Sequence, residues 1–183
     1  VLPAGASEGC FAELEAISRA WMAGKHTREK GFSLGAFQRD YLARLPLALV
    51  RREGRVVAFA DIWTGAEGSE VSPDLMRFDP EAAPASVMEY LFVQLMQWGH
   101  AEGYESMSLG MAPLSGLSSD PLAPVWSRVG AAIFRHGEHF YNFQGLRAYK
   151  QKFSPSWEPR YLASAGGLGV GTSLLRVSAL VSG

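Results

Sequence analysis

The sequence predicts an α/β fold in which helices flank a mixed, mostly antiparallel sheet. Helical spacing of apolar residues dominates the first part of the chain, and runs rich in β-branched residues replace it after Pro46. A long amphipathic segment from Pro84 to Glu102 then leads into a short apolar run. A strand, a helix and a second strand in this order are typical of a crossover between parallel strands, so the sheet is expected to be mixed.

Two helices are expected before the sheet. In the segment Phe11–Ala23, the apolar residues Leu14, Ile17 and Trp21 recur near one helical face. A shorter helix is predicted from Gly35 to Leu45, where Pro46 stops it. Both of these helices therefore precede the first strand.

Three strands are expected next. Leu47–Arg52 and Arg55–Trp63 are joined by Glu53-Gly54, a two-residue turn that is typical of a β-hairpin. Glu70–Phe78 continues as a third strand, and Pro73 marks a bulge or an edge position within it. These three segments predict an antiparallel meander.

The remainder of the chain alternates between helices and strands. The central helix, Pro84–Glu102, has Val87, Leu91, Leu95 and Trp98 at helical spacing. The later elements are a strand at Glu105–Gly110, helices at Pro121–Arg135 and Gln144–Phe153, a strand at Trp157–Ala163, a glycine-rich hinge at Ala165–Gly171 and a short helix at Thr172–Leu180.

The length and the composition fit one folded domain. With 183 residues and 48% hydrophobic content, the chain can bury one sizeable core, and we predict a single domain over residues 1–183. The formal net charge of -1 argues against a generally basic nucleic-acid binder, so contact with RNA or anionic lipid requires a local patch. Such a patch consists of Arg147, Lys150, Lys152 and Arg160, with Glu158 as the only acid in that stretch.

Several kinds of site are not expected. Cys10 is the single cysteine, which excludes an internal disulfide. The histidines have no metal-ligand spacing, since His136 and His139 are accompanied only by Glu138, and we predict no metal. Ser115 lacks the G-x-S-x-G elbow of a serine hydrolase. No run of about 18 apolar residues occurs that would cross a bilayer.

Asp74 and Arg77 in the segment SPDLMR are candidates for chemistry. In a regular strand, residues three positions apart face opposite sides of the sheet, but a bulge would bring both side chains toward one cleft. The pattern alone favours a structural ion pair at a sheet edge, because most charged pairs are structural or solvated.

The turn before the central helix bears on the choice of acyl donor. An acetyl-CoA enzyme of this topology needs a glycine-rich turn whose backbone N–H groups hold the pyrophosphate. Here the turn, Asp79–Pro84, contains two acids and two prolines, which repel phosphate and remove donors. Acetyl-CoA is therefore not expected as a donor, and no other cofactor is predicted. The sequence GGLGVG at Gly166–Gly171 lacks the glycine spacing of a dinucleotide loop.

Three segments carry a resemblance to a known family. SPDLMR, LGMAPLSGL at Leu109–Leu117 and YNFQGLRAYKQKF at Tyr141–Phe153 resemble the C-terminal catalytic region of aminoacyl-phosphatidylglycerol synthases, the multiple peptide resistance factor family. The resemblance extends from the segment beginning at Glu29 to Ala163 and into the terminal helix, and it implies a GNAT-like acyltransferase fold. Family members resemble a tandem of two GNAT-like halves behind a membrane domain, and this chain is similar to the second half. The resemblance places it on the cytoplasmic face of the bacterial cytoplasmic membrane, with the upstream half and the membrane domain as partners.

The resemblance also implies a reaction and a set of site residues. Family members transfer a lysyl or alanyl group from aminoacyl-tRNA to phosphatidylglycerol, which lowers the negative charge of the membrane and gives resistance to cationic peptides. Asp74 lies at the family's functional pair and would orient the α-ammonium group or polarise the acceptor hydroxyl, while Arg77 would hold a phosphate or stabilise the developing oxyanion. The expected substrate-binding residues are Tyr141, Asn142, Arg147, Lys150, Lys152 and Arg160.

Other functions remain open at this point. An aminoacyl transferase that acts on a peptide or peptidoglycan amine would share the fold and the donor. A non-catalytic half that docks tRNA or membrane would use the basic helix at Gln144–Phe153, where Arg147, Lys150 and Gln151 share one face. The plain interpretation of that helix is a solvated basic surface.

Overall fold

The computed structural model describes residues 1–24, 35–113, 115–117, 120, 122, 143–161, 172–173 and 176. The chain forms two compact units, one made of residues 1–108 with the C-terminal residues from 163, and the other of residues 109–162. The prediction of a single GNAT-like domain over residues 1–183 stays a prediction. The predicted helix Pro121–Arg135 and hinge Ala165–Gly171 lie outside the described residues apart from Leu122, and so does most of the terminal helix.

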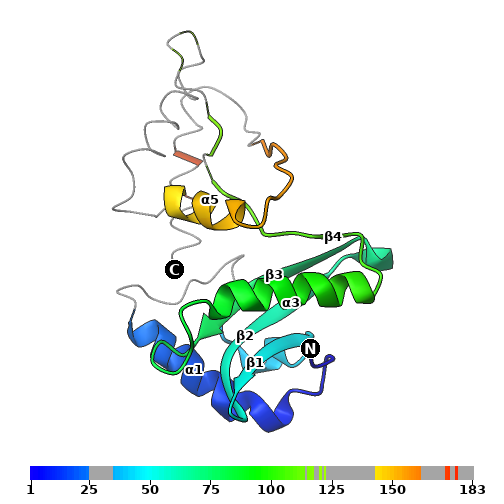
Figure 1. Ribbon diagram of the computed structural model, residues 1–183, viewed down its shortest axis with the longest axis vertical. Helices are drawn as coiled ribbons and strands as arrows, with labels where there is room; N and C mark the ends of the chain where they lie inside the picture. Colours follow the sequence, from blue (N-terminus) through cyan, green and yellow to red (C-terminus); the bar gives the residue numbers. More distant parts are fainter. Residues whose placement is uncertain are drawn as a thin grey trace. The chain divides into compact units, whose positions relative to one another are not determined.

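The first unit is a four-stranded mixed sheet with helices on its faces (Figure 1). The strands are β1 (Leu47–Arg52), β2 (Arg55–Thr64), β3 (Glu70–Phe78) and β4 (Ser106–Met107), in the spatial order β1-β2-β3-β4. The first three are antiparallel, and β4 lies parallel to β3 after the chain has crossed through helix α3 (Val87–Ala101). This arrangement confirms the predicted class, a mixed and mostly antiparallel sheet flanked by helices.

Two apolar clusters lie on opposite faces of this sheet. Helix α1 (Phe11–Ala23) buries Phe11, Leu14 and Ile17 in a cluster with sheet residues that include Phe59 and Leu75. Helix α3 buries Val87, Leu91 and Leu95 in the second cluster, with sheet residues that include Ala60, Ile62 and Val71. We call these two sides the α1 face and the α3 face. Burial of apolar area on both sides holds the unit together.

The predicted hairpin is present, and its backbone angles account for the glycine in the turn. Glu53 and Gly54 join β1 to β2 with backbone φ values of 51° and 83°. Two successive positive φ values are those of the turn whose twist matches a β-hairpin, and glycine adopts them without steric cost.

Two predicted elements differ from the structure. The helix expected at Gly35–Leu45 is reduced to α2 (Arg39–Leu42), because Gln38 is extended and Gly35 lies against β3. A Cβ atom added to Gly35 would stand 2.8 Å from the backbone nitrogen of Leu75, so this stretch follows the strand instead of coiling. The central helix and the strand β4 have the predicted type, but both are shorter than expected.

The second unit contains helix α5 (Phe143–Gln151), which agrees with the predicted helix at Gln144–Phe153. The strand expected at Trp157–Ala163 is wrong in its described part, since residues 157–161 have no regular structure. The chain turns after α5 at Ser154, whose φ is 49°, and the indole N–H of Trp157 then donates to the side-chain oxygen of Gln151 at 2.9 Å. The segment therefore folds back onto α5.

Candidate functional site

A bulge interrupts the pairing of β3 with β2 where the sequence predicted one. Ala60 pairs with Met76 and Ile62 pairs with Pro73, so a single residue on β2, Asp61, lies opposite two residues on β3. Those two residues are Asp74 and Leu75. Opposing two residues to one is the defining feature of a β-bulge, and it shifts the alternation of side chains along the bulged strand by one position.

The bulge places Asp74 and Arg77 on the same side of the sheet. Beyond the bulge, Met76 and Phe78 pack on the α3 face. The Arg77 guanidinium lies on the α1 face, with its central carbon 4.1 Å from the centre of the Trp21 ring of α1. The charge of Asp74 acts on the phenol of Tyr41, which packs against the α1-face cluster. The expectation that a bulge overrides the alternation of a regular strand agrees with this geometry.

The carboxylate of Asp61 holds the backbone of the bulge. Its Oδ1 atom accepts hydrogen bonds from the backbone N–H groups of Leu75 at 2.7 Å and of Asp74 at 3.2 Å. Asp61 is fully buried. Burial raises the pKa of Asp61 to about 6; the bond from Leu75 acts against the rise, and the charge of Asp74 adds to it.

The environment of Asp74 is set by two neighbours on the α1 face. Gly35 approaches so closely that an added Cβ atom would stand 2.8 Å from Oδ2 of Asp74. Burial raises the pKa of the Tyr41 phenol, and the charges of Asp61 and Asp74 add to the rise, whereas a hydrogen bond with Trp63 opposes it. Asp74 itself is half-buried. The site therefore contains two neighbouring carboxylates, Asp74, which is partly accessible, and Asp61, which is buried.

Arg77 is 8% exposed, and its Nη1 atom also donates to the carbonyl of Met76 at 3.1 Å. A planar guanidinium stacked on an aromatic ring gains cation–π attraction. These contacts fit a structural role as well as a functional one, so the assignment to substrate rests on the family pattern and on the shared face with Asp74.

The basic residues of the second unit are held by their own surroundings. Lys150 is buried, and its Nζ atom donates to the carbonyl of Met111 at 2.8 Å. Burial lowers the pKa of this amine. Arg147 donates to Oγ of Ser115 at 2.9 Å and lies over the ring of Trp157, with 4.4 Å to its centre. The helix face that carries Arg147 and Lys150 therefore faces the rest of its own unit at these two positions, which disagrees with the plain interpretation of a solvated basic surface.

The remaining candidates are more exposed. Lys152 lies 5.2 Å from the centre of the Tyr149 ring, and Arg160 forms an ion pair with Glu158 at 3.2 Å in which both side chains are largely exposed. Tyr141 and Asn142 lie outside the described residues. The structure thus describes Asp74 and Arg77 in one unit and Arg147, Lys150, Lys152 and Arg160 in the other.

The turn before α3 is held by a carboxylate of the chain itself, that of Asp79. Oδ1 of Asp79 accepts hydrogen bonds from the backbone N–H groups of Glu81 at 2.9 Å and of Ala82 at 3.1 Å. From the sequence, the acids of this turn are expected to repel phosphate and its prolines to remove donors. The structure adds that a carboxylate of the chain already engages two amides of this turn.

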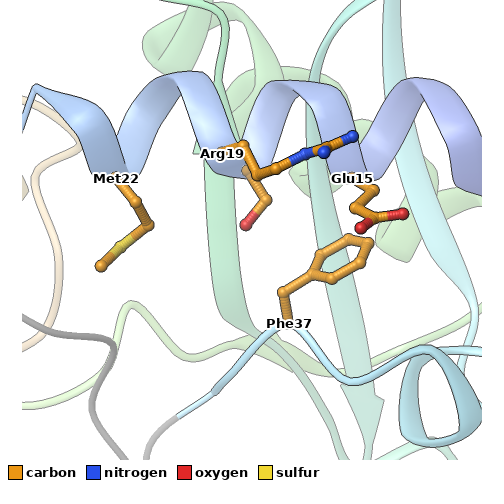
Figure 2. Close-up of a pocket in the computed structure, with 5 residues that line it drawn as sticks. Glu15, Arg19, Met22 and Phe37 are labelled. Carbon is orange, nitrogen blue, oxygen red and sulfur yellow. The ribbon is translucent and has the colours of Figure 1, made fainter.

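A hollow of about 340 Å³ lies beside α1 (Figure 2). Phe37 faces the helix there, opposite Glu15 and Arg19, while Met22 lies further along the helix. Asp74 and Arg77 do not line it. Within the described part of the chain, no three His, Cys, Asp or Glu side chains gather in a way that would hold a metal ion. No helix among the same residues is long and apolar enough to span a bilayer.

Sequence reasoning missed Asp61. A signal was present, because Asp61 is the single charged residue inside the otherwise apolar run from Val56 to Trp63. A charge in the middle of a buried strand is rarely tolerated unless it has polar partners. Its role depends on the register of β2 against β3, which the pattern of one strand does not reveal.

Comparisons with known proteins agree with the resemblance. The family model described as phosphatidylglycerol lysyltransferase, C-terminal, matches residues 1–164. The phosphatidylglycerol lysyltransferase of Bacillus subtilis (strain 168) is 37% identical over 177 residues, which are 96% of this chain and 20% of that protein. The one from Staphylococcus haemolyticus (strain JCSC1435) is 32% identical over 176 residues, 96% of this chain and 21% of that protein. The chain spans about a fifth of the length of these curated relatives.

Two solved structures are similar over nearly the whole chain. The C-terminal domain (DUF2156) of a protein assigned as a lysylphosphatidylglycerol synthetase of Agrobacterium fabrum has a TM-score of 0.84 and 43% identity, covering 100% of this chain and 54% of that one. L-PGS from Bacillus licheniformis has a TM-score of 0.76 and 39% identity, covering 96% and 52%. Because the family model and these relatives cover most of its length, the chain belongs to the phosphatidylglycerol lysyltransferase family and corresponds to its C-terminal part.

Proposed function

We propose that the protein containing this chain is a transferase that moves a lysyl group onto phosphatidylglycerol. The match of the family model to residues 1–164 carries the proposal, and the names of the curated relatives support lysine as the amino acid. Because the chain spans a fifth of those relatives, we assign it the part of the reaction that its own residues serve, and we assign the membrane domain and the upstream half to the rest of the protein.

The proposed donor is aminoacyl-tRNA. In this reaction a glycerol hydroxyl of the lipid attacks the carbonyl carbon of the aminoacyl ester, and the bond to the ribose oxygen breaks. The hydroxyl proton passes to the ribose oxygen, so one ester replaces another and the energetics are mild. Such a step depends mainly on the positioning of the two substrates.

The turn before α3 supports a donor other than a coenzyme A thioester. In an acetyl-CoA enzyme of this topology, amides at the start of the helix hold the pyrophosphate. Here the carboxylate of Asp79 accepts from the amides of Glu81 and Ala82. A pyrophosphate would have to displace that carboxylate and approach it at close range.

Asp74 and Arg77 are the proposed reacting-centre residues. Asp74 is half-buried on the α1 face, where its carboxylate would orient the α-ammonium of the lysyl group or polarise the acceptor hydroxyl. The ribose hydroxyl next to the ester would relay the proton. Arg77 shares that face and would hold a phosphate or stabilise the oxyanion that develops at the carbonyl.

The cations of the second unit are the proposed phosphate contacts. Lys152 and Arg160 are exposed, so a tRNA acceptor end or a lipid head group can approach them from solvent. Arg147 and Lys150 are second in rank, because Arg147 is half-buried and Lys150 is buried. Tyr141 and Asn142 complete the proposed set.

A lysyl ester of phosphatidylglycerol carries two added ammonium groups, the α and the ε, so the membrane surface becomes less negative. A less negative surface attracts cationic peptides more weakly, which would give resistance to them. The family resemblance places the domain at the cytoplasmic leaflet, so the product would have to reach the outer leaflet to weaken the attraction for peptides that arrive from outside.

The test is transfer of labelled lysine from charged tRNA into chloroform-extractable lipid, with the full-length protein and phosphatidylglycerol vesicles. Label in the lipid is expected with lysyl-tRNA. Alanyl-tRNA is the competing donor, and vesicles of phosphatidylcholine are the control acceptor. Label that enters only a peptide or peptidoglycan amine would replace the proposal with the other acceptor. No transfer by an intact protein that still binds tRNA would point to a docking function.

A further inference from the structure

Asp61 is a buried carboxylate whose function the proposed reaction does not yet use. It is the only residue on β2 between Ala60 and Ile62, and it lies opposite both residues of the β3 bulge. A carboxylate with no exposed surface does not touch a substrate. Any influence of Asp61 on transfer must therefore pass through the groups that it contacts.

The contacts of Asp61 are the two amides that the bulge removes from the regular ladder. One oxygen, Oδ1, accepts from both Leu75 and Asp74. Buried amides without an acceptor would cost about 1–3 kcal/mol each, so the bulge depends on this oxygen or on a replacement for it. The second oxygen, Oδ2, is buried and has no hydrogen-bond donor among the described residues.

The charged and titratable groups around Asp61 come from two elements of the α1 face. On β3 the group is Asp74, whose amide Asp61 holds and whose charge adds to the rise of the Asp61 pKa. On α2 the phenol of Tyr41 lies close enough to sense the charges of both Asp61 and Asp74. Of these groups, Asp74 is bonded to Asp61 through its backbone, so a displacement of the Asp61 oxygen displaces the origin of the Asp74 side chain.

We propose that Asp61 is a positioning residue, which fixes the direction of the Asp74 side chain by holding the two amides of the β3 bulge through one oxygen. This inference rests on the proposed transfer reaction and on the role of Asp74 in it. It requires an acceptor oxygen at the position of Oδ1. It does not require the negative charge of the carboxylate.

Two substitutions separate geometry from charge. Asp61→Asn keeps an acceptor oxygen in place and removes the charge, whereas Asp61→Glu keeps the charge and moves the oxygens by one methylene group. Misplacement of a reacting group by about 1 Å costs on the order of 100-fold in rate. In the full-length protein we expect Asp61→Asn to keep about a third or more of kcat, and Asp61→Glu to lose roughly 10- to 100-fold, with the KM for lysyl-tRNA unchanged within about twofold.

Glu13 provides a matched control. It lies on α1, and its Oε2 atom accepts the backbone N–H of Val56 at 2.9 Å, so it is also a carboxylate that bonds a strand amide in the first unit. Glu13→Gln and Glu13→Asp remove the charge and displace the oxygen in the same two ways, at a place remote from the bulge in sequence. Both are expected to leave transfer within about twofold of the wild type.

A double-mutant comparison distinguishes positioning from a general loss of structure. If Asp61 acts through Asp74, Asp61→Glu causes no further loss in a protein that already carries Asp74→Ala. The same fold-loss in both backgrounds would overturn the proposal. So would a folded Asp61→Asn protein that loses about 100-fold in kcat, because the charge and not the acceptor would then be what matters.

A measurement independent of activity tests whether Asp61 holds the two amides of the bulge. Hydrogen exchange of the amides of Asp74 and Leu75 is expected to remain slow in Asp61→Asn and to become about tenfold or more faster in Asp61→Glu. Equal exchange in both variants would overturn the proposal even if transfer were affected. Absence of lysyl transfer by the wild-type protein, with this exchange pattern intact, would count against the proposed function and not against the role of Asp61 in the bulge.

Discussion

The bulge of β3 and the helix α5 both present charged residues that we assign to substrates, but they fix those residues in different ways. At the bulge, the buried side chain of Asp61 on β2 accepts hydrogen bonds from the backbone amides of Asp74 and Leu75 on β3. The backbone of Asp74 is therefore held in place without any contact of its own side chain. On α5, the charged groups of Arg147 and Lys150 are themselves bonded, to Ser115 and to the Met111 carbonyl.

This difference has a mechanistic consequence. A carboxylate that is positioned through its backbone keeps its oxygens for a substrate, which suits a group at the reacting centre. A cation that already donates to its own unit must exchange that bond for one to a phosphate, which suits a binding contact that is made and released. We therefore expect substitutions at the bulge to change kcat, and substitutions on α5 to change substrate binding.

The largest expected effect is on the rate of transfer. Asp74→Ala and Arg77→Ala should each lower kcat by about 100-fold or more, the usual cost of removing a positioned charge from a reacting centre. The measurement is label in lipid after incubation with lysyl-tRNA. Glu70→Ala and Arg55→Ala serve as controls, because each removes an exposed charge of the same type from β3 or β2. Near-normal transfer by folded Asp74→Ala would end the assignment.

The next effect is a pH dependence of stability. The pKa of Asp61 is raised from 3.8 to about 6 by burial, so the folded state binds this proton more tightly than the unfolded state. The contribution of Asp61 protonation to the free energy of unfolding is fully present below about pH 4, and it is lost as the pH rises through the folded-state pKa of about 6. Relative to Asp61→Asn, the free energy of unfolding of the wild type should fall by up to about 3 kcal/mol between pH 4 and pH 8. Urea denaturation at several pH values measures it, and a difference that stays constant would contradict it.

A smaller effect is expected where the chain approaches the bulge. Gly35→Ala would place a Cβ atom 2.7 Å from Cβ of Leu75 and 2.8 Å from Oδ2 of Asp74. Relief of that overlap should cost about 1–3 kcal/mol of stability and displace Asp74, which lowers transfer as well. Gly9→Ala is the matched control, because an added Cβ atom there meets no atom within 4 Å. Equal unfolding midpoints for the two variants would refute the close approach.

The smallest effect concerns α5. Lys150→Met keeps most of the apolar stem but leaves the Met111 carbonyl without its donor, at a cost of about 1–2 kcal/mol. Faster hydrogen exchange in residues 109–113 is the expected signature. Arg160→Gln breaks an exposed ion pair and should change stability by less than about 0.5 kcal/mol. Equal exchange in the two variants would show that the buried amine does not hold this segment.

The fold was predictable where the local pattern and the tertiary contacts agree. The apolar spacing of α1 and α3 and the turn at Glu53-Gly54 identified their elements from the sequence. The helix from Gly35 to Leu45 was predicted too long, because the close approach of Gly35 to β3 is a tertiary contact. The strand predicted at Trp157–Ala163 is absent from its described part, where Trp157 covers Arg147 and bonds Gln151.

The sequence was sufficient to name the candidate reacting residues, but not the buried residue that holds their backbone. The family resemblance identified Asp74 and Arg77, and Pro73 suggested a bulge near them. The contribution of Asp61 follows from strand register, which sets one residue opposite two and is not encoded within either strand alone. Burial of Lys150 was missed for a related reason, since the segment that covers it is 39 residues away in sequence.

Asp74 and Arg77 are proposed to act together at one reacting centre on the α1 face. The direct measurement is lysyl transfer by the full-length protein with Asp74→Ala, Arg77→Ala and both substitutions together. If the two side chains serve the same step, the double variant should be scarcely slower than the slower single variant, because residues that act as a unit are strongly non-additive. Losses that multiply in the double variant would show that the two residues act independently, and would contradict the shared site.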